Sequence, residues 1–211
     1  MLTTFYKSKL GLAAEIFALT IFPLILLKFF PEWIHSRTAV MFGGLSYVLI
    51  FVWTQKIKSK NLGLRISNFL PAAKDIFRPT LLAITLTFIL FYGWRELISV
   101  PLLIGEINQL PSATVLALRY LFISAPIQEM LYRAYLINRV EFISRNKWFI
   151  QGYSAIIFML IHTPIRNFFL TGGTLILGWI WAGHFLKYRN IFSVILSHGL
   201  IGLVYVFLMV Q

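Results

Sequence analysis

The last long apolar run of the chain, residues 191–210, reads IFSVILSHGLIGLVYVFLMV and contains one ionisable side chain, His198. A helix needs about 20 mostly apolar residues to cross the hydrocarbon core of a bilayer, so this run is long enough to span it. The alternating pattern of membrane-barrel strands is absent. Comparable apolar runs lie near Leu10–Phe29, Thr38–Thr54, Thr80–Ile98, Phe149–His162 and Phe168–Leu186. The sequence therefore predicts an all-α polytopic membrane protein.

The composition of the whole chain supports this class. Of its 211 residues, 59% are hydrophobic and 12% are charged, whereas an ordinary soluble domain is about 45–50% apolar and about 25% charged. So few charges cannot cover a water-facing surface, which excludes a soluble globular domain and a disordered chain. The chain has no cysteine, so disulfides, thiolate zinc sites, iron–sulfur sites and a cysteine nucleophile are excluded.

The formal net charge of +12 raises the question of a partner. A strongly basic soluble protein would suggest nucleic acid, but no RNA- or DNA-binding motif accompanies the charge here. Basic residues between apolar runs instead mark cytoplasmic loops that meet anionic lipid. We therefore expect no nucleic-acid partner and expect anionic lipid at the inner leaflet.

The number of spans depends on the stretch Ser112–Ile143, which forms either one long helix kinked at Pro126 or two short helices. One helix gives seven spans with a cytoplasmic N-terminus and an outer C-terminus, and two helices give eight. The positive-inside rule favours seven, because thirteen of the 19 basic residues then lie on the inner side. These thirteen are Lys7, Lys9, Lys56, Lys58, Lys60, Arg65, Lys74, Arg78, Arg139, Arg145, Lys147, Lys187 and Arg189.

The chain shows no internal repeat and no domain boundary, so residues 1–211 are predicted to form a single membrane domain. No small-residue cleavage site follows the first apolar run, which is therefore predicted to be a retained span. The inner loop Gln55–Arg78 mixes apolar and basic residues, which favours an amphipathic segment on the inner leaflet. The expected location is the plasma or inner membrane, with the chain crossing it several times.

Ionisable side chains inside the spans are costly in lipid, so each of them needs a reason. Glu129 and Arg133 are four residues apart on one helical face, in the order that favours an ion pair. Two interpretations stay open: a structural pair that makes each charge tolerable, or a carboxylate held by its neighbour for acid–base work.

Two histidines lie in other spans. His162 ends a strongly apolar run, and His198 lies inside the last one. Two imidazoles and a carboxylate can deprotonate water, stabilise an oxyanion and protonate a leaving amine, and they also match a zinc-binding set. Glu15 and Arg119 are predicted to be bundle-interior or snorkelling groups, and His184 a helix-end or packing residue. Packing and interfacial roles are predicted for Tyr132, Trp148, Trp179 and Trp181.

The order and spacing of these residues resemble the CPBP family of intramembrane endopeptidases (CAAX proteases and bacteriocin-processing, or Abi, proteins). That family carries Glu-Glu-x-x-x-Arg, Phe-x-x-x-His and His-x-x-x-Asn on successive motif-bearing spans. The corresponding segments here are Gln128-Glu129-Met-Leu-Tyr-Arg133, Phe158-Met-Leu-Ile-His162 and His198-Gly-Leu-Ile-Gly202. Three short motifs in the right order are moderately specific. The resemblance covers about residues 115–210, and Leu177-Gly178-Trp179 and Asn61-Leu-Gly-Leu-Arg65 also look like the family.

The resemblance implies roles for individual residues. Glu129 and His162 would activate a water, His198 would stabilise the oxyanion, and Gln128 and Arg133 would support them. No metal or other cofactor is implied, although zinc is not excluded. The sequence departs from the family at Gln128, which stands where the first glutamate is expected, and at Gly202, which stands where the asparagine is expected.

The first functional hypothesis is therefore an intramembrane endopeptidase that hydrolyses a peptide bond of a membrane-associated protein or peptide. The two departures motivate the alternative, a catalytically inactive scaffold or regulator with the same fold. A transporter with a proton path through the buried ionisable groups is a third hypothesis, but the paired broken helices and repeats of such proteins are absent from the sequence.

Overall fold

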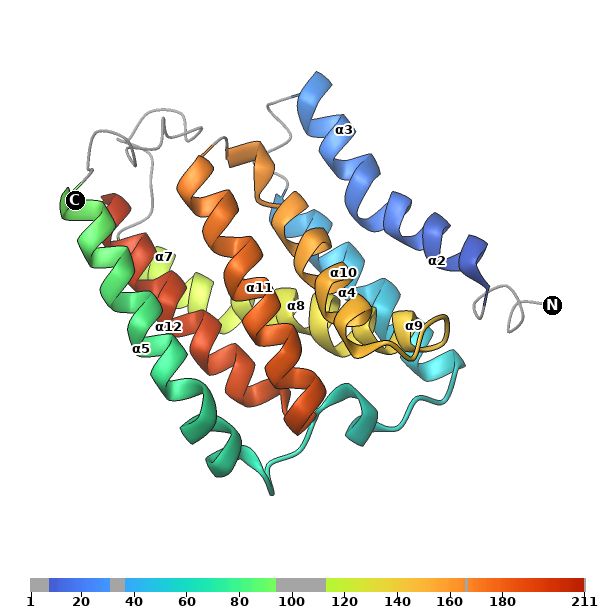
Figure 1. Cartoon of the computed structure of the whole chain (residues 1–211). Coiled ribbons are helices and arrows are strands. Elements are labelled where there is room, and N and C mark those ends of the chain that lie inside the picture. The colour runs from blue at the N-terminus through green and yellow to red at the C-terminus, as the bar shows by residue number, and fades with distance from the viewer. Residues whose placement is uncertain (1–7, 31–36, 94–112, 166, 211) are drawn as a thin grey trace.

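The computed structural model describes residues 8–30, 37–93, 113–165 and 167–210, and all regular secondary structure in these ranges is helical. The N-terminal half contains α2 (Lys9–Ile16), η1 (Phe17–Ile21), α3 (Phe22–Phe29), α4 (Arg37–Thr54), η3 (Ser59–Leu62) and α5 (Phe69–Gly93). The C-terminal half contains α7 (Ala113–Arg119), η5 (Tyr120–Ser124), α8 (Ala125–Glu129), η6 (Met130–Tyr135), α9 (Leu136–Glu141), α10 (Lys147–Leu160), η7 (Thr163–Ile165), α11 (Phe168–Tyr188) and α12 (Ile191–Val210). Figure 1 shows these helices packed into one bundle. The all-α class predicted from the sequence is confirmed.

Helices fall where apolar runs were recognised. Within the described residues, four of them are long and apolar enough to cross a membrane: Phe69–Gly93, Lys147–Ile165, Phe168–Tyr188 and Ile191–Leu208. A shorter apolar helix covers Ala39–Thr54. Large apolar side chains such as Trp53, Leu82 and Ile89 are exposed on the outer faces of these helices, where lipid would cover them. These features are those of an integral membrane protein.

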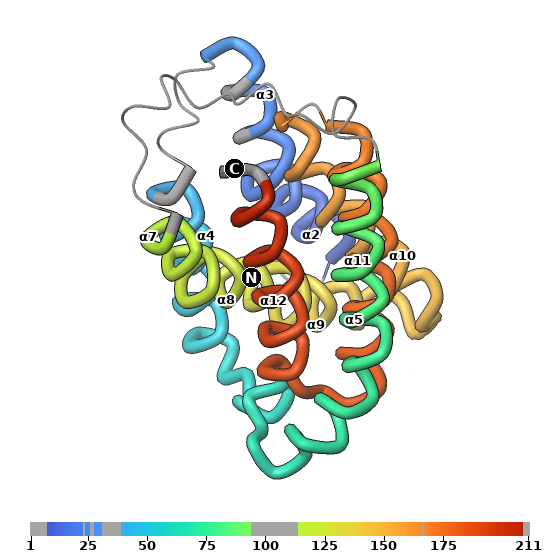
Figure 2. Tube along the Cα trace, turned by 90° about the vertical axis from the view of Figure 1, so that its left-hand side faces the viewer, coloured from blue at the N-terminus to red at the C-terminus, as the bar shows by residue number. Residues whose placement is uncertain are grey.

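The stretch from Ala113 to Glu141 is one continuous helix rather than two. It contains two π-helical segments, η5 and η6, and the first lies directly before Pro126. Proline lacks an N–H and its ring collides with the carbonyl four residues earlier, so the wider winding of η5 lets the helix continue past Pro126. Figures 1 and 2 show this helix crossing α12, with α7 on one side of α12 and α9 on the other.

Helices α5 and α12 run side by side in the same direction. Thr80 Oγ1, near the middle of α5, lies 2.6 Å from Ser197 Oγ in the second turn of α12. Phe91 and Leu208 share a buried cluster near the last turns of the two helices. Successive spans alternate in direction, so two spans are parallel only when the chain crosses the membrane an even number of times between their first residues. This direction is the one that the seven-span arrangement requires, although the number of spans itself stays a prediction.

Helices α10 and α11 form a tight hairpin because glycines line the contact. A Cβ added at Gly178 would lie 3.2 Å from Ala155 Cα, and one at Gly152 would lie 3.1 Å from the Trp179 ring. Asn146 and Asn167 begin the two helices, each accepting backbone N–H groups with its side chain. The hairpin fixes where α10 ends and therefore where His162 lies.

The loop between α4 and α5 is anchored to the turn between α11 and α12. Gly63 has φ of +75°, and its carbonyl accepts the N–H of Ile191 at 2.9 Å. Asn190, which is fully buried, donates to Arg65 O at 2.6 Å. The amphipathic segment predicted over residues 55–78 is not a single element in the structure. Residues 55–68 form the loop with η3, and residues 69–78 are the first turns of α5.

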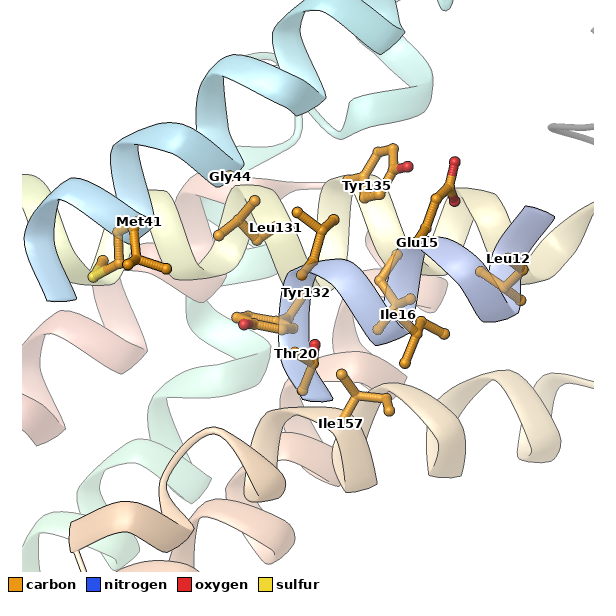
Figure 3. Close-up of a pocket in the computed structure, with 13 residues that line it drawn as sticks. Leu12, Glu15, Ile16, Thr20, Met41, Gly44, Leu131, Tyr132, Tyr135 and Ile157 are labelled. Carbon is orange, nitrogen blue, oxygen red and sulfur yellow. The ribbon is translucent and has the colours of Figure 1, made fainter. Parts of the chain in front are cut away.

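Helix α2 is fixed to the rest of the bundle by a buried ion pair. Arg139 Nε lies 2.7 Å from Glu15 Oε2, and the Tyr47 hydroxyl donates to Glu15 Oε1 at 2.8 Å. Arg139 was predicted to lie in an inner loop, but it is only 1% exposed; the loop assignment is wrong because the helix continues to Glu141. Beside this pair lies a mostly apolar cavity of about 90 Å³ between η1, α4 and η6, and Figure 3 shows Glu15 and Tyr135 at its edge.

Candidate active site

Three helices bring the motif residues together. Glu129 is the last residue of α8, His198 lies in α12, and His162 lies in the turn that follows α10. The last turn of α10 is closed by the His162 N–H, which donates to Met159 O at 2.9 Å. Figure 2 shows α8 and α12 crossing, which is how residues 129 and 198 meet.

Glu129 is fully buried, and its two carboxylate oxygens face different partners, one in a hydrogen bond and the other in an ion pair that lacks hydrogen-bond geometry. Oε1 lies 2.7 Å from His198 Nδ1, and Oε2 lies 3.2 Å from Arg133 Nε. The ion pair expected from the four-residue spacing is therefore present, and the carboxylate also reaches an imidazole of another helix. A carboxylate accepts hydrogen bonds only, so Nδ1 of His198 is the donor in this contact.

Arg133 is also fully buried, and aromatic faces take the place of water around its guanidinium. Its Cζ lies 4.1 Å from the centroid of the Phe158 ring and 5.5 Å from that of Trp181. A desolvated cation gains about 2 kcal/mol from such a face. Arg133 thus neutralises Glu129 while the aromatic pair stabilises Arg133, and the motif-two phenylalanine has a structural role.

His198 is held on three sides. Its Nε2 lies 2.8 Å from the Tyr120 hydroxyl, and its ring stacks on Trp181 at a centroid distance of 4.5 Å. Trp181 is fixed in turn by its indole N–H, which donates to Ser197 Oγ at 3.0 Å. Trp181 is only 2% exposed, so of the packing and interfacial roles predicted for this group of residues it has the packing role.

His162 presents one nitrogen to the site. Its Nδ1 lies 2.8 Å from Phe158 O, and because a carbonyl only accepts, Nδ1 carries the hydrogen. The neutral ring then has its lone pair on Nε2, and no described residue hydrogen-bonds that atom. The Phe158 ring lies between the two histidines, at centroid distances of 4.7 Å from His162 and 5.6 Å from His198.

A cavity of about 130 Å³ opens beside the two imidazoles. This volume is well above the roughly 10–15 Å³ that one ordered water requires. Its lining is mostly apolar, with a few polar groups facing inward, as expected of a small-ligand or peptide site. The lining residues with polar side-chain atoms are Thr87, Tyr120, His162, Asn167, Thr174, Trp181, His198 and Tyr205.

The structure separates the two neighbours Gln128 and Glu129. Glu129 faces His198, whereas the buried Oε1 of Gln128 has no hydrogen-bond partner among the described residues and Gln128 does not line the cavity. The sequence left open which of the two would face the histidines. Glu129, His198 and Arg133 are brought into contact, His162 faces the same cavity, and Gln128 stands apart.

Tyr120 is the site residue that the sequence did not reveal. In an undistorted α-helix, positions nine apart such as 120 and 129 differ by about 180° in direction, so both would not be expected near His198. The π-helical winding of η5 and the length of the phenol bring them together. No sequence signal marks this, except that Gly202 leaves space beside His198.

His184, by contrast, is structural, as predicted. Its Nε2 lies 3.0 Å from Ser193 Oγ and its Nδ1 lies 3.3 Å from Asp75 Oδ2, which ties α11 to α12 and α5. Across the described ranges, no group of three or more histidine, aspartate or glutamate side chains is arranged to hold a metal ion.

The class that this geometry defines is a helical membrane protein with a buried glutamate–histidine pair beside a cavity between spans. Residues 110–204 match the family model for type II CAAX prenyl endopeptidases, described as Rce1-like. The match confirms the resemblance to the CPBP family and nearly coincides with the core expected over residues 115–210. No match was found among curated proteins or solved structures.

Proposed function

We propose that the protein is an intramembrane endopeptidase that uses two histidines and a buried glutamate to hydrolyse a peptide bond. One observation carries this proposal: Glu129 contacts His198 from another helix, and His198 shares a cavity with His162. A purely structural ion pair would need neither imidazole, and it would need no cavity beside them.

In the proposed reaction, a water in the cavity donates a hydrogen bond to Nε2 of His162. As the water oxygen bonds to the carbonyl carbon of the substrate, His162 takes its proton and negative charge develops on the carbonyl oxygen. His198 then stabilises that charge. When the C–N bond breaks, the proton passes from His162 to the leaving amine.

The proposed role of Glu129 differs from the one implied by the resemblance. One of its oxygens hydrogen-bonds His198, the other is ion-paired with Arg133, and Glu129 does not line the cavity. We therefore assign it to positioning: it holds His198 through Nδ1, while Arg133 balances its charge. The proton acceptor in the cavity is then His162 rather than the glutamate.

The substrate class follows from the surroundings. Apolar side chains such as Leu90, Phe91 and Phe169 line the cavity. Binding there would cost an extended apolar peptide segment less desolvation free energy than a polar segment. The proposed substrate is a membrane-associated protein or peptide. The proposed orientation is that of the seven-span arrangement in a plasma or inner membrane, with a cytoplasmic N-terminus.

Anionic lipid is the proposed partner of the loop before α5. Lys56, Lys58 and Lys60 are exposed there, as are Ile66 and Leu70, which is the composition of an interfacial segment. Each lysine near an anionic surface contributes about 1 kcal/mol. Replacing Lys58 with glutamine should weaken retention of an anionic lipid during delipidation, measured by native mass spectrometry, and should leave zwitterionic lipid unaffected.

An inactive scaffold is the second candidate, and two observations favour it. Gln128 stands apart from the cavity, and Gly202 offers no side-chain donor. In that case the glutamate–histidine pair would fix α8 against α12, and partners would bind without being cut.

The experiment that separates the candidates uses the purified chain in liposomes with fluorogenic transmembrane peptides, and mass spectrometry to identify cut sites. The variant is His162→Ala and its matched control is His184→Ala, another largely buried histidine that does not line the cavity. Loss of a general base should lower the rate about 10²–10⁴-fold in the first variant only. Equal cleavage by wild type and His162→Ala would contradict the proposed reaction.

A further inference from the structure

Helix α12 carries no side chain at the position one turn after His198. Residue 202 is a glycine, and a Cβ built on it would collide with the ring and hydroxyl of Tyr120. No other described glycine has so severe a conflict with a single side chain, and both residues line the same cavity. The space that a side chain at 202 would occupy is filled by a phenol from another helix.

The Tyr120 hydroxyl is placed for chemistry as well as for packing. It lies 2.8 Å from Nε2 of His198, and the two rings meet edge to face at a centroid distance of 5.8 Å. Tyr120 is therefore the fourth group in a chain of contacts that runs from Arg133 through Glu129 and His198. It lines the cavity.

We propose that Tyr120 replaces the missing side chain at position 202 and donates the hydrogen bond that holds the carbonyl oxygen of the substrate beside His198. This inference rests on the proposed endopeptidase function and names one further catalytic residue for it. It also explains how the site tolerates Gly202, where the resemblance to the CPBP family leads one to expect an asparagine.

The proposed donor role sets the direction of each hydrogen bond in the group. It requires both ring nitrogens of His198 to donate, Nδ1 to Glu129 and Nε2 to the Tyr120 oxygen. The hydroxyl hydrogen of Tyr120 is then free to point into the cavity. A phenol whose oxygen accepts from an imidazolium is a stronger donor, because the hydrogen bonds polarise one another.

The first test removes only the hydroxyl. In the liposome assay, Tyr120→Phe should lower kcat about 10²–10³-fold, the usual effect of losing one oxyanion donor, with little change in KM. The matched control is Tyr153→Phe, a tyrosine of α10 that does not line the cavity, and it should cleave at the wild-type rate. Cleavage by Tyr120→Phe at the wild-type rate would overturn the inference.

The second test exchanges the two positions. Gly202→Asn alone should abolish cleavage, because its Cβ and Tyr120 cannot occupy the same space. The double variant Tyr120→Ala/Gly202→Asn should cleave at least about tenfold faster than Tyr120→Ala, because the amide restores a donor from α12. A double variant that is no faster than Tyr120→Ala would count against replacement.

A stability measurement separates failure of the inference from failure of the proposed function. Gly202→Ala should lower the melting temperature in detergent when Tyr120 is present and much less in the Tyr120→Ala background. Equal losses in both backgrounds would overturn the placement of Tyr120, whatever the activity. A wild-type chain that cuts no peptide would contradict the function and the catalytic role of Tyr120, whereas the stability cycle would still test the replacement.

Discussion

Two buried ion pairs use arginines of the same long helix, and only one of them also contacts an imidazole beside the larger cavity. Arg133 and Arg139 are six residues apart on the helix that runs from α7 to α9, and each pairs with a buried glutamate. Glu15 is held by Arg139 and by the Tyr47 hydroxyl. Glu129 is held by Arg133 and by His198, and His198 continues to Tyr120 and the larger cavity.

The difference lies in the second partner of each carboxylate. A tyrosine that donates to Glu15 completes its hydrogen bonding and adds nothing that exchanges protons near neutral pH. An imidazole that donates to Glu129 has a second ring nitrogen, which contacts the Tyr120 hydroxyl. The negative charge of Glu129 therefore acts, through His198, on a group that lines the larger cavity. The cavity beside Glu15 is mostly apolar and contains no imidazole. Burial and pairing alone therefore do not mark a catalytic carboxylate.

The largest expected effect comes from Glu129→Gln. The amide keeps the shape of the side chain but cannot stabilise a charged His198, so kcat should fall about 10²–10⁴-fold. The measurement is cleavage of a transmembrane peptide in liposomes by protein that elutes as a folded species. To separate positioning from direct proton transfer, the ¹⁵N signals of the His198 ring should change while those of His162 stay the same. Unchanged His198 signals would remove the basis for the positioning role.

Glu15→Gln is the matched change at the other pair. It leaves Arg139 buried without its counter-charge, which typically costs about 3–5 kcal/mol of stability. Cleavage per folded molecule should equal that of the wild type. The free energy of unfolding in mixed micelles measures the first quantity, and peptide cleavage measures the second. A fall in kcat as large as that of Glu129→Gln would remove the distinction between the two pairs.

Arg133→Lys should have an intermediate effect. Lysine keeps the positive charge but loses the planar group that lies over Phe158, a contact of about 2 kcal/mol when desolvated. We expect a loss of stability of that order, together with a fall in kcat smaller than that of Glu129→Gln. Thermal unfolding and initial rates measured on one preparation test both. A lysine variant as stable as the wild type would show that the aromatic faces do not stabilise the arginine.

Tyr47→Phe should have the smallest combined effect, because it should lower stability about as much as Arg133→Lys but leave kcat unchanged. It removes one hydrogen bond to the Glu15 carboxylate, worth about 1.5–3 kcal/mol for a charged acceptor, and it should leave cleavage unchanged. The comparison with Tyr120→Phe is direct, because each change removes a phenol that bonds a buried pair. If Tyr47→Phe lowers kcat and Tyr120→Phe does not, the assignment of the two pairs is reversed.

The sequence predicted the elements of the fold well and their relations poorly. Apolar runs placed most helices within a few residues, because the length and hydropathy of a span are properties of the segment itself. The exception is α5, which begins at Phe69 and not at Thr80, where its apolar run was predicted to start. Arg139 shows the limit: a basic residue near a helix end was predicted to lie in a loop, yet it pairs with Glu15 far away in the sequence. Charge counting cannot recognise a buried arginine whose partner lies on another helix.

The sequence by itself determined the class of the protein and the motif residues at the site. Glu129, Arg133, His162 and His198 stood out because so few ionisable groups can be buried in a membrane protein. Only the tertiary structure decided that Glu129 rather than Gln128 faces His198, and that Tyr120 fills the space at Gly202. Both depend on how one helix winds around Pro126 and crosses α12, and contacts between helices carry no periodicity that a single sequence reveals.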